Sequence, residues 1–558
     1  MSTTNDNGLV FPARDAVLPD RPCPKLPSHW TSPLAAFVVR ARNNPKKLLV
    51  KDSTGESGTN EEVLLAATAL ACTIFDEVRD SAFVGILLPP SKHSLVLNIA
   101  VSLLGKIPIN LNYSSGDGPI NSAIVQTGLM TVFTSKRVME KGGFKIAARV
   151  LYLEDIAGQV SDGAKGVAWL LNRVIPTFAW KFFMPGMSKG LDDTASIMFT
   201  SGSTGEPKGV QLTNSNLLYN IAQLAAHARV GEEKVLGCLP YFHSYGFGVT
   251  LWAGLVLGWE LYPHHNPLDA RGICEFIAEN GITAMATTPT FMRNYLKRGK
   301  KEQFASLKLL MMGSEKLKPE LARDIREQLG KEPLEGYGCT ETSPVLSSCI
   351  NLDVTSPTGA SVSGTREGSV GQMVPGSAVA VLDPTTNAIL PRGRKHEGRI
   401  FVNGPQIMKG YYGKPRETAN CLQNGWYFTG DIGAVDEDGF LYLTDRESRF
   451  AKVGPEMVPI IKVEAELRTL AGVDELSIAV CAIPDAAKGE KLVVLYTDDR
   501  VKPSELTRAL TASGMHTLWI PKVSDFHKVT GPFAQTASGK LDLKAIKKIA
   551  VDMDAAQG

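Results

Sequence analysis

The sequence has little that marks a secreted, metal-binding or nucleic-acid-binding protein. Residues 1–20 are polar and lack a basic region followed by an apolar run, so they do not resemble a secretory signal. Positive and negative charges nearly balance, at 59 Lys and Arg against 57 Asp and Glu, which gives no overall attraction for nucleic acid. The eight cysteines are scattered, without a CxxC pair or metal-ligand spacing. We therefore expect a protein of the reducing cytoplasm with no nucleic-acid partner.

Internal repeats and low-complexity stretches are also absent, which excludes a repeat architecture. A length of 558 residues predicts several packing units, and 44% hydrophobic residues are enough for large cores. Short strand and helix patterns alternate, as is typical of βαβ units around a mainly parallel sheet. The predicted strands are 48–51, 82–88, 195–199, 235–239, 282–287 and 307–312, and the predicted helices are 33–41, 61–78, 94–104, 271–279 and 319–329.

The pattern changes near residue 445. Beyond it, the chain is more basic, and shorter elements predict a small α+β domain of a size that commonly folds independently. We expect a loosely held tail at 1–30, a large α/β domain at 31–445, and a mobile small domain at 446–558. The predicted elements of the small domain are helices 463–470 and 503–512 and strands 476–482 and 491–496.

Residues 166–190 break the alternation. The stretch is rich in Trp, Phe and Leu but carries Arg173, Pro176 and Lys181, and its apolar runs are far shorter than the roughly 18 residues of a membrane span. Two interpretations stay open. The stretch is either a packed connection or an interfacial segment that touches lipid or a long acyl chain, which would give the protein a peripheral membrane contact.

Residues 197–209, IMFTSGSTGEPKG, carry the strongest local signal. An apolar strand leads into a loop whose glycines let backbone N–H groups approach an anion, and whose hydroxyls and ammonium add donors. It is not a Walker loop, because Pro207 and Gly209 flank the lysine. The pattern predicts a phosphate cradle, although a flexible surface turn has a similar composition. The cradle residues are Thr200, Ser201, Gly202, Ser203, Thr204, Gly205 and Lys208.

TSGSTGEPKG resembles the signature loop of the adenylate-forming superfamily, which includes acyl-CoA synthetases, luciferases and peptide-synthetase adenylation domains. Four further stretches resemble family motifs in the family's order: EGYGCTET at 335–342, NGWYFTGDIG at 424–433, DGFLYLTDRESRFAKVG at 438–454 and TASGKLDL at 536–543. The resemblance implies ATP as substrate, Mg2+ as cofactor, and a large domain followed by a mobile small one.

The first of these stretches concerns the nucleotide and the metal. The resemblance assigns Tyr337 to the adenine, Thr340 to the phosphates, and Glu341 with Thr200 to Mg2+. A carboxylate beside a hydroxyl suits such a hard cation. The resemblance adds to the nucleotide site Gly313, Ser314, Glu335 and Gly336.

The last three stretches supply residues around the ribose and the reacting groups. Asp431, predicted to follow a tight turn at 429–430, would accept the ribose hydroxyls, and Arg446 would help to hold ribose and phosphate. Lys452 resembles the lysine that faces the site in the second half-reaction. Lys540 resembles the lysine that bridges the α-phosphate and the attacking carboxylate, where an ammonium offsets their repulsion.

Two positions depart from the family pattern. Ser448 replaces the usual charged hinge residue, and Pro455, which has no N–H, follows the glycine after Lys452. Both concern the second half-reaction more than adenylation.

Two histidine positions need separate treatment. His243 lies at the family position that lines the acyl or phosphate end of the site, although a lone histidine is also often a core residue. His264 and Asp269 have the H-x4-D spacing of glycerolipid acyltransferases. No acyltransferase pattern surrounds them, so chance explains that spacing better.

Within the superfamily, PINLNYSSG, LPYFHSYGFGVTL, RFAKVGPEMV and DAAKGEKLVVLYT resemble the acyl-acyl-carrier-protein synthetase branch, the ligase part of 2-acylglycerophosphoethanolamine acyltransferase. The branch implies transfer of a long-chain fatty acid to the phosphopantetheine thiol of acyl carrier protein. The alternatives are a fatty or aryl acyl-CoA ligase and a silent acyl- or nucleotide-binding homologue. Acyl chain length and oligomeric state stay open. A basic cluster that would suit an acidic carrier protein comprises Arg293, Lys297, Arg298, Lys300 and Lys301.

Overall fold

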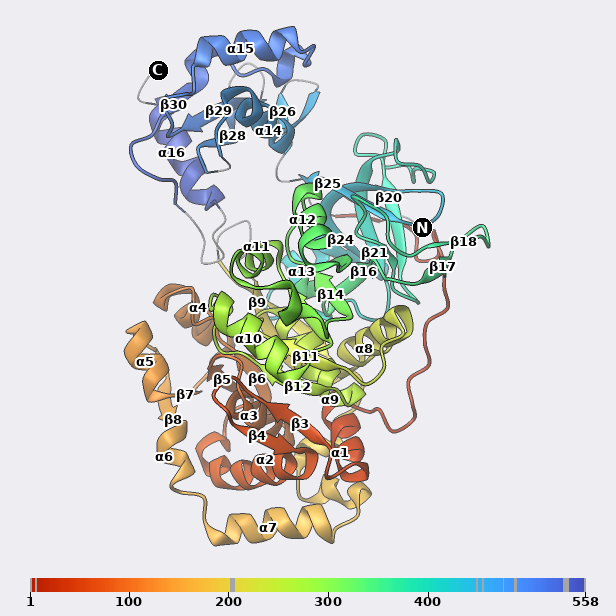
Figure 1. Ribbon diagram of the computed structural model, residues 1–558, viewed down its shortest axis with the longest axis vertical. Helices are drawn as coiled ribbons and strands as arrows, with labels where there is room; N and C mark the ends of the chain where they lie inside the picture. Colours follow the sequence, from red (N-terminus) through yellow and green to blue (C-terminus); the bar gives the residue numbers. More distant parts are fainter. Residues whose placement is uncertain are drawn as a thin grey trace. The chain divides into compact units, whose positions relative to one another are not determined.

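The computed structural model describes residues 3–5, 8–200, 206–447, 450–453, 456–474, 476–485, 489–534 and 541–555. The chain divides into two compact units with separate hydrophobic cores. The first comprises Met1–Thr429 and Ala434–Tyr442, and the second Gly430–Gly433 and Leu443–Gly558. The first is α/β and the second α+β, which confirms the predicted fold class (Figure 1).

A nine-stranded sheet organises the middle of the first unit, in the order β19-β16-β15-β14-β13-β11-β12-β3-β4. The strands from β3 to β15 in this order run parallel, and antiparallel strands close both edges. Parallel strands need crossover connections, which explains the helices between them. The strands are β3 (Leu48–Lys51), β4 (Ser57–Thr59), β11 (Lys234–Gly237), β12 (Glu260–Pro263), β13 (Ala284–Thr287), β14 (Leu309–Met312), β15 (Pro333–Gly338), β16 (Val345–Ser348) and β19 (Gln372–Met373).

Two smaller sheets precede and flank the signature loop. The first is fully parallel, in the order β6-β5-β7-β8, and the second is antiparallel, in the order β22-β10-β9. Apolar residues from both sheets share one core. The strands are β5 (Phe83–Leu87), β6 (Ile107–Asn110), β7 (Thr131–Thr134), β8 (Arg149–Tyr152), β9 (Thr194–Thr200), β10 (Lys208–Thr213) and β22 (Gly410–Tyr411).

A five-stranded sheet follows later in the chain, in the order β20-β21-β24-β23 with β25 beside β24. The division between the two units passes through β24 and β25. The strands are β20 (Ala378–Leu382), β21 (Gly398–Asn403), β23 (Leu422–Gln423), β24 (Trp426–Val435) and β25 (Leu441–Arg446), and two short pairs are β1 (Thr3–Thr4) with β2 (Val10–Phe11) and β17 (Asp353–Thr355) with β18 (Ser361–Ser363).

Local capping explains where several helices begin. Ser32 accepts a hydrogen bond from the N–H of Ala35 and is followed by Pro33, a residue favoured at a first helical position. Thr59 and Glu62 form a capping box. The α-helices of the first unit are α1 (Pro33–Asn43), α2 (Asn60–Ile74), α3 (Lys92–Leu103), α4 (Asp117–Thr127), α5 (Lys136–Gly142), α6 (Leu153–Ala157), α7 (Asp162–Arg173), α8 (Asn214–Ala228), α9 (Gly254–Leu257), α10 (Ala270–Asn280), α11 (Pro289–Arg298), α12 (Pro319–Leu329) and α13 (Pro415–Cys421).

The second unit packs three helices with a sheet in the order β27-β26-β29-β28, and β30 pairs with β29. Alternate residues of β28 and β29 enter two separate apolar clusters, so this sheet is buried on both faces. Its elements are β26 (Phe450–Val453), β27 (Glu456–Pro459), α14 (Ile460–Ala471), β28 (Ile478–Asp485), β29 (Gly489–Tyr496), α15 (Pro503–Ala512), β30 (Phe526–Lys528) and α16 (Leu543–Ala555). The mobility of residues 446–558 stays a prediction.

Most predicted elements occur within a few residues of their expected bounds, and one is divided. The predicted helix at 61–78 ends at Ile74, and a 3-10 turn covers Asp76–Val78. Such tightening is common at helix ends. Residues 166–190 hold the end of α7 and two 3-10 helices, η2 (Thr177–Phe182) and η3 (Pro185–Ser188). Among the described residues, no helix combines the length and the apolar character needed to cross a bilayer.

Candidate active site

Strands β9 and β10 hold the two ends of the predicted phosphate loop. They pair antiparallel, with Lys208 opposite Thr200, and both side chains are half-buried. Gly209 lies opposite Phe199, and a Cβ atom there would be 2.8 Å from the Ile197 side chain, which explains the glycine after the lysine. The cradle residues outside the described part of the chain are Ser201, Gly202, Ser203, Thr204 and Gly205.

Tyr411 connects this hairpin with Glu341. Its strand β22 pairs with β10, and the Lys208 ammonium lies 5.1 Å from the centre of the Tyr411 ring. The Tyr411 hydroxyl donates a hydrogen bond to Glu341 Oε1 at 2.9 Å. Burial, and then the nearby Glu341 carboxylate, raise the pKa of Tyr411, so the phenol keeps the proton that it donates.

Glu341 belongs to the 3-10 turn η6 (Thr340–Thr342) and is 8% exposed. Its backbone carbonyl accepts a hydrogen bond from Met408 N at 2.8 Å, which fixes the turn from the backbone side. Next to it, Thr340 Oγ1 donates to Ser244 Oγ at 3.3 Å. Among the described residues, no Lys, Arg or His forms an ion pair with Glu341. In this part of the chain, the donor to the carboxylate is the neutral Tyr411 phenol.

This donor set fits Mg2+ bound together with a nucleotide. Mg2+ in phosphate-transfer sites is held by one or two carboxylates, while substrate phosphates and water supply the remaining oxygens. Within the described part of the chain, no group of three or more His, Cys, Asp and Glu side chains is arranged to hold a metal alone. Glu341 is thus suited to hold Mg2+ with substrate oxygens.

Parallel strands bring the next predicted residues to one edge of the nine-stranded sheet. Gly313 and Ser314 directly follow β14, and Glu335, Gly336 and Tyr337 lie in the last part of the neighbouring β15. Ser314 has a φ of 67°, in the left-handed region, and a Cβ at Gly313 would be 3.1 Å from the Tyr245 ring. Ligands of open α/β sheets bind at this carboxyl edge of the strands.

Glu335 is a buried carboxylate within this edge. Its Oε1 accepts a hydrogen bond from Leu317 N at 2.8 Å. Burial raises its pKa to about 7, although the Leu317 bond and the Lys316 ammonium oppose this shift. Glu335 therefore carries a partial charge near neutral pH and holds the segment that follows Ser314.

His243 follows β11, which ends at the same edge of the sheet. Its side chain is exposed, and its Nδ1 accepts a hydrogen bond from Tyr245 N at 3.3 Å. It is therefore not a buried core histidine. The bond to Tyr245 ties the ring to the loop that also supplies Ser244 to Thr340.

The other histidine pair has a structural explanation. His264 is buried, and its Nε2 lies 3.8 Å from Asp269 Oδ2. Asp269 is the N-cap of α10 and accepts a hydrogen bond from Gly272 N at 3.0 Å. Burial, followed by His265, lowers the pKa of His264. The Asp269 carboxylate thus caps the N-terminus of α10.

Asp431 and Arg446 belong to the second unit and contact each other. Asp431 Oδ1 lies 3.2 Å from Arg446 Nε, and the Asp431 side chain is 9% exposed against 61% for Arg446. The predicted turn before Asp431 is wrong, because Trp426–Val435 is one strand, β24. Gly430 has a φ of 76°, which is irregular for a strand, and β24 nevertheless continues through it.

Four predicted positions can be located only in part or not at all. Lys452 lies in β26, and its side chain is not among the described atoms. Lys540, Ser448 and Pro455 lie outside the described residues. Their roles stay predictions.

The basic cluster has a simple structural cause. Lys297 and Arg298 occupy the last turn of α11, where cations interact favourably with the helix dipole. Arg293, Lys300 and Lys301 are exposed beside them. The helix dipole is enough to explain these positions, so docking of a carrier protein at the cluster stays a prediction.

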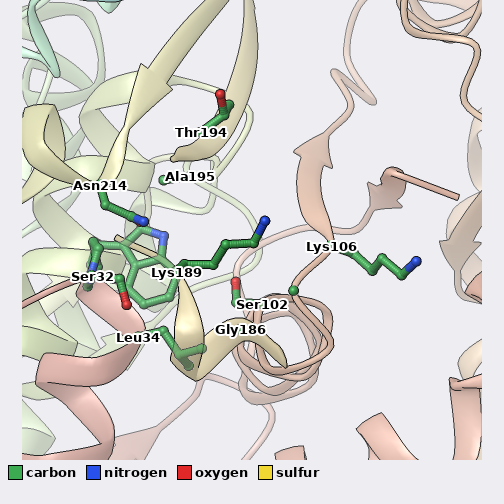
Figure 2. Close-up of a pocket in the computed structure, with 12 residues that line it drawn as sticks. Ser32, Leu34, Ser102, Lys106, Gly186, Lys189, Thr194, Ala195 and Asn214 are labelled. Atoms are coloured by element: carbon green, nitrogen blue, oxygen red, sulfur yellow. The ribbon is translucent and has the colours of Figure 1, made fainter. Parts of the chain in front are cut away.

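A separate pocket lies at the other end of β9 (Figure 2). Thr194 and Ala195, at the start of this seven-residue strand, line it, whereas the phosphate loop follows the strand's end, about 20 Å away. None of its twelve lining residues is a predicted site residue. The pocket is therefore distinct from the nucleotide site.

Comparison with known proteins decides the family. A model of the AMP-binding enzyme family matches residues 37–412, most of the chain. The chain belongs to the AMP-binding enzyme family. This match includes the β9–β10 hairpin, Glu341 and Tyr411, and it confirms the resemblance to adenylate-forming enzymes.

Curated relatives of this AMP-binding enzyme are acid–CoA ligases. It is 33% identical to the long-chain-fatty-acid–CoA ligase of Bacillus subtilis over 359 residues, 62% of this chain and 60% of that protein. It is 28% identical to the feruloyl-CoA synthase of an Amycolatopsis species over 511 residues, 90% of this chain and 96% of that protein.

Solved structures support the same fold. ATP-bound MatB from Rhodopseudomonas palustris matches with a TM-score of 0.75 at 24% identity, over 94% of this chain and all of that one. The o-succinylbenzoate coenzyme A synthetase MenE of Bacillus subtilis, in complex with ATP and magnesium ion, matches with a TM-score of 0.72 at 22% identity, over 91% of this chain and 98% of that one.

Sequence reasoning missed Tyr411. The residue is 70 positions from Glu341, and a Gly-Tyr-Tyr triplet carries no specific signal. Only the pairing of β22 with β10 brings its hydroxyl to the carboxylate. Sequence reasoning also missed Ser244. A single serine beside a histidine carries no specific signal, and only the fold brings it to Thr340.

Proposed function

We propose that this AMP-binding enzyme is an ATP-dependent, AMP-forming ligase that activates a fatty acid and passes the acyl group to a phosphopantetheine thiol. The observation that carries the proposal is Glu341, a buried carboxylate held by the phenol of Tyr411, whose strand β22 pairs with β10 of the phosphate-loop hairpin. A buried carboxylate without a cationic partner is costly to maintain unless a bound cation compensates it.

The residues around Glu341 supply the binding groups. Glu341 and Thr200 would hold Mg2+, which supplies charge neutralisation at the phosphates. The loop between β9 and β10, with Lys208 and Thr340, would bind the phosphate oxygens. The carboxyl edge at β14 and β15 would bind the adenine side of ATP, with Tyr337 against the base. Asp431 and Arg446 would bind the ribose.

The reaction has two steps. A fatty-acid carboxylate oxygen attacks the α-phosphorus of ATP, the bond to the β-phosphate oxygen breaks, and acyl-AMP and pyrophosphate form. The thiol sulfur, after losing its proton, then attacks the acyl carbon, and AMP leaves as the thioester forms. Lys540 would hold the carboxylate against the α-phosphate in the first step, and Lys452 would face the site in the second, after residues 446–558 move.

The acid and the acceptor are the finer parts of the proposal. Resemblance to the acyl-acyl-carrier-protein synthetase branch favours a long-chain acid and acyl carrier protein. The relatives named above favour CoA, and the match to feruloyl-CoA synthase keeps an aryl acid as the second candidate. Both acceptors present the same phosphopantetheine thiol. Scattered free cysteines favour action in the cytoplasm.

The test offers the purified protein ATP, Mg2+ and one acid at a time, from octanoate to stearate and including ferulate, with either CoA or holo-acyl carrier protein. Products are followed by mass spectrometry and by ATP–pyrophosphate exchange. Preferential acyl-carrier-protein formation supports the branch assignment. Preferential formation of acyl-CoA would support the ligase activity but make CoA the acceptor. Absence of ATP–pyrophosphate exchange with every acid would overturn the proposal.

A variant pair tests the role of Lys540. Lys540→Ala should abolish exchange while thioester formation from supplied acyl-AMP persists, because the lysine serves the first step. Lys548→Ala, an exposed lysine on α16, is the matched control and should behave as wild type. Equal loss of both half-reactions in Lys540→Ala would contradict the assignment.

A further inference from the structure

One short segment concentrates much of the exposed hydrophobic surface. Among the described residues, 21 large hydrophobic side chains are exposed, and seven of them lie between residues 167 and 183. Soluble surfaces scatter such residues singly, so a concentration of this kind indicates an interaction site. The seven, here called the aromatic segment, are Val167, Trp169, Leu170, Val174, Phe178, Phe182 and Phe183.

Helix α7 buries one face and exposes apolar side chains beside it. Its inner face buries Ala168 and Leu171, and α7 packs against α2 at the outer edge of the first unit (Figure 1). Arg173 forms an ion pair with Glu61 of α2. At 100° per residue, Trp169 and Leu170 point away from the buried face, and Val174 follows the last residue of the helix. Packing against α2 therefore leaves Trp169 and Leu170 exposed to solvent.

The phenylalanines that follow α7 are held in place by Trp180. Trp180 is fully buried, and its Nε1 donates to the Leu171 carbonyl at 3.0 Å. Met184 is buried beside it and donates its N–H to the Trp180 carbonyl at 2.7 Å. Phe178 and Phe182 are 77% and 75% exposed. Trp180 thus anchors this part of the chain, while the neighbouring Phe178 and Phe182 side chains face solvent.

The sequence around the phenylalanines is basic. Residues 163–191 contain Lys165, Arg173, Lys181 and Lys189 and no acidic residue. Within the described part of the chain, Lys181 has no carboxylate partner, and its ammonium lies 5.3 Å from the centre of the Phe182 ring. Lys165 pairs with Asp162 at 3.1 Å, and Lys189 with Asp193 at 4.0 Å, each at an exposed position where such pairs are weak.

A further lysine, Lys189, lies just after the segment. Lys106 and Lys189 both line the pocket of Figure 2, next to Gly186 of η3. The pKa of Lys106 is lowered, first by burial, and the nearby Lys189 ammonium adds to this while Asp80 opposes it. The Lys106 ammonium donates a hydrogen bond to the Arg79 carbonyl at 2.7 Å.

We infer that the aromatic segment docks this protein on an anionic lipid surface, with Phe178, Phe182 and Phe183 in the headgroup region and Lys181 against lipid phosphates. Aromatic side chains next to lysines are typical of segments that lie in the membrane interface. An acidic carrier protein would need mainly basic groups on this surface, whereas three exposed phenylalanine rings and the Lys181 ammonium suit the interface of a bilayer. The surface therefore matches lipid better than an acidic protein.

Membrane docking also has a functional consequence, which rests on the proposed function. A long-chain fatty acid partitions into bilayers, so an enzyme held at the surface meets its acid at high local concentration. Vesicle binding itself requires neither ATP nor catalysis. Failure of docking and failure of the ligase proposal are therefore distinguishable.

The test is cosedimentation of the full chain with large unilamellar vesicles of phosphatidylcholine alone, or with about 30% phosphatidylglycerol, at two salt concentrations. We expect binding to the anionic vesicles that weakens with salt. The variant F178S/F182S/F183S should bind at least about 30-fold more weakly, because three apolar anchors are lost. Lys181→Glu should weaken binding by about tenfold, on the anionic vesicles only.

A matched triple variant controls for the general loss of exposed hydrophobic surface. L18S/V125S/L268S removes three side chains that are 72%, 75% and 68% exposed at scattered positions of the first unit, and it should bind as wild type. Thermal unfolding checks that each variant folds. Absence of vesicle binding by the wild type, or equal binding by both triple variants, overturns the inference. A wild-type dimer that F178S/F182S/F183S converts to a monomer would overturn it too, in favour of a second copy of this chain.

Discussion

Counted over the whole residue, Glu341 and Asp431 are nearly equally buried, at 8% and 6% exposure, and yet different partners hold them. In the first unit, Glu341 accepts a hydrogen bond from the neutral Tyr411 phenol. In the second unit, Asp431 pairs with the Arg446 guanidinium. A neutral donor orients a carboxylate and leaves its charge for another cation, whereas a guanidinium compensates the charge and leaves oxygens that can accept from hydroxyls. The contrast supports a metal role for Glu341 and a ribose role for Asp431.

The largest effect is expected at Glu341. Glu341→Gln keeps the shape but removes the charge, and it should reduce ATP–pyrophosphate exchange about 10³-fold, or about 4 kcal/mol, because the metal loses its carboxylate. A Mg2+ titration should also shift to higher concentrations. Glu327→Gln, at an exposed position on α12, is the control. Normal exchange by Glu341→Gln at ordinary Mg2+ would contradict the metal role.

Glu335 adds a third buried carboxylate to the comparison of Glu341 with Asp431. Burial is the largest influence on its pKa. Its pKa is raised from 4.5 to about 7, so between these values the folded chain holds a proton that the unfolded chain releases. Stability therefore falls as pH rises from 4.5 to 7 and then levels, by at most about 3 kcal/mol. Glu335→Gln should remove this loss and be more stable than wild type at pH 8.

Denaturant unfolding of wild type and Glu335→Gln between pH 5 and pH 8 measures this difference. Glu320→Gln, exposed in the first turn of α12, should follow the wild-type curve. Parallel curves for wild type and Glu335→Gln would show that Glu335 is ionised throughout.

Asp431 should show a smaller effect, confined to the nucleotide. Asp431→Asn should raise the KM for ATP about 30-fold, or about 2 kcal/mol, the value of hydrogen bonds to a charged acceptor. The variant should discriminate less against 2′-deoxy-ATP than wild type does. Asp498→Asn, which removes an exposed ion pair with Arg500 in the same unit, should leave both properties unchanged. If Asp431→Asn discriminated between ATP and 2′-deoxy-ATP as wild type does, Asp431 would not bind the ribose.

The smallest effect tests the neutral partner of Glu341. Tyr411→Phe removes one hydrogen bond and should slow exchange about fivefold, or about 1 kcal/mol. The neighbouring Tyr412 packs edge-on against Phe83, so Tyr412→Phe keeps its ring contact and is the matched control. A loss as large as that of Glu341→Gln would mean that Tyr411 itself touches the reacting groups.

The sequence predicted local elements well because their determinants are local. Strand 48–51 and helices 319–329 and 503–512 have the predicted bounds, since apolar periodicity and a proline at the helix start act within a few residues. The predicted turn before Asp431 failed, because a glycine with positive φ is compatible with both a turn and an irregular strand. Pairing with neighbouring strands decided between them.

By itself, the sequence determined the family and the order of its motifs, because the signature loop, the stretch around Glu341 and the stretch around Asp431 are each written in consecutive residues. Only the tertiary structure decided which partner each carboxylate has. It also decided that Trp180 is buried while Phe178 and Phe182 face solvent, although all three lie in one aromatic run. Burial and pairing depend on elements distant in the chain, such as β22 beside β10 and α2 beneath α7, and no local pattern encodes them.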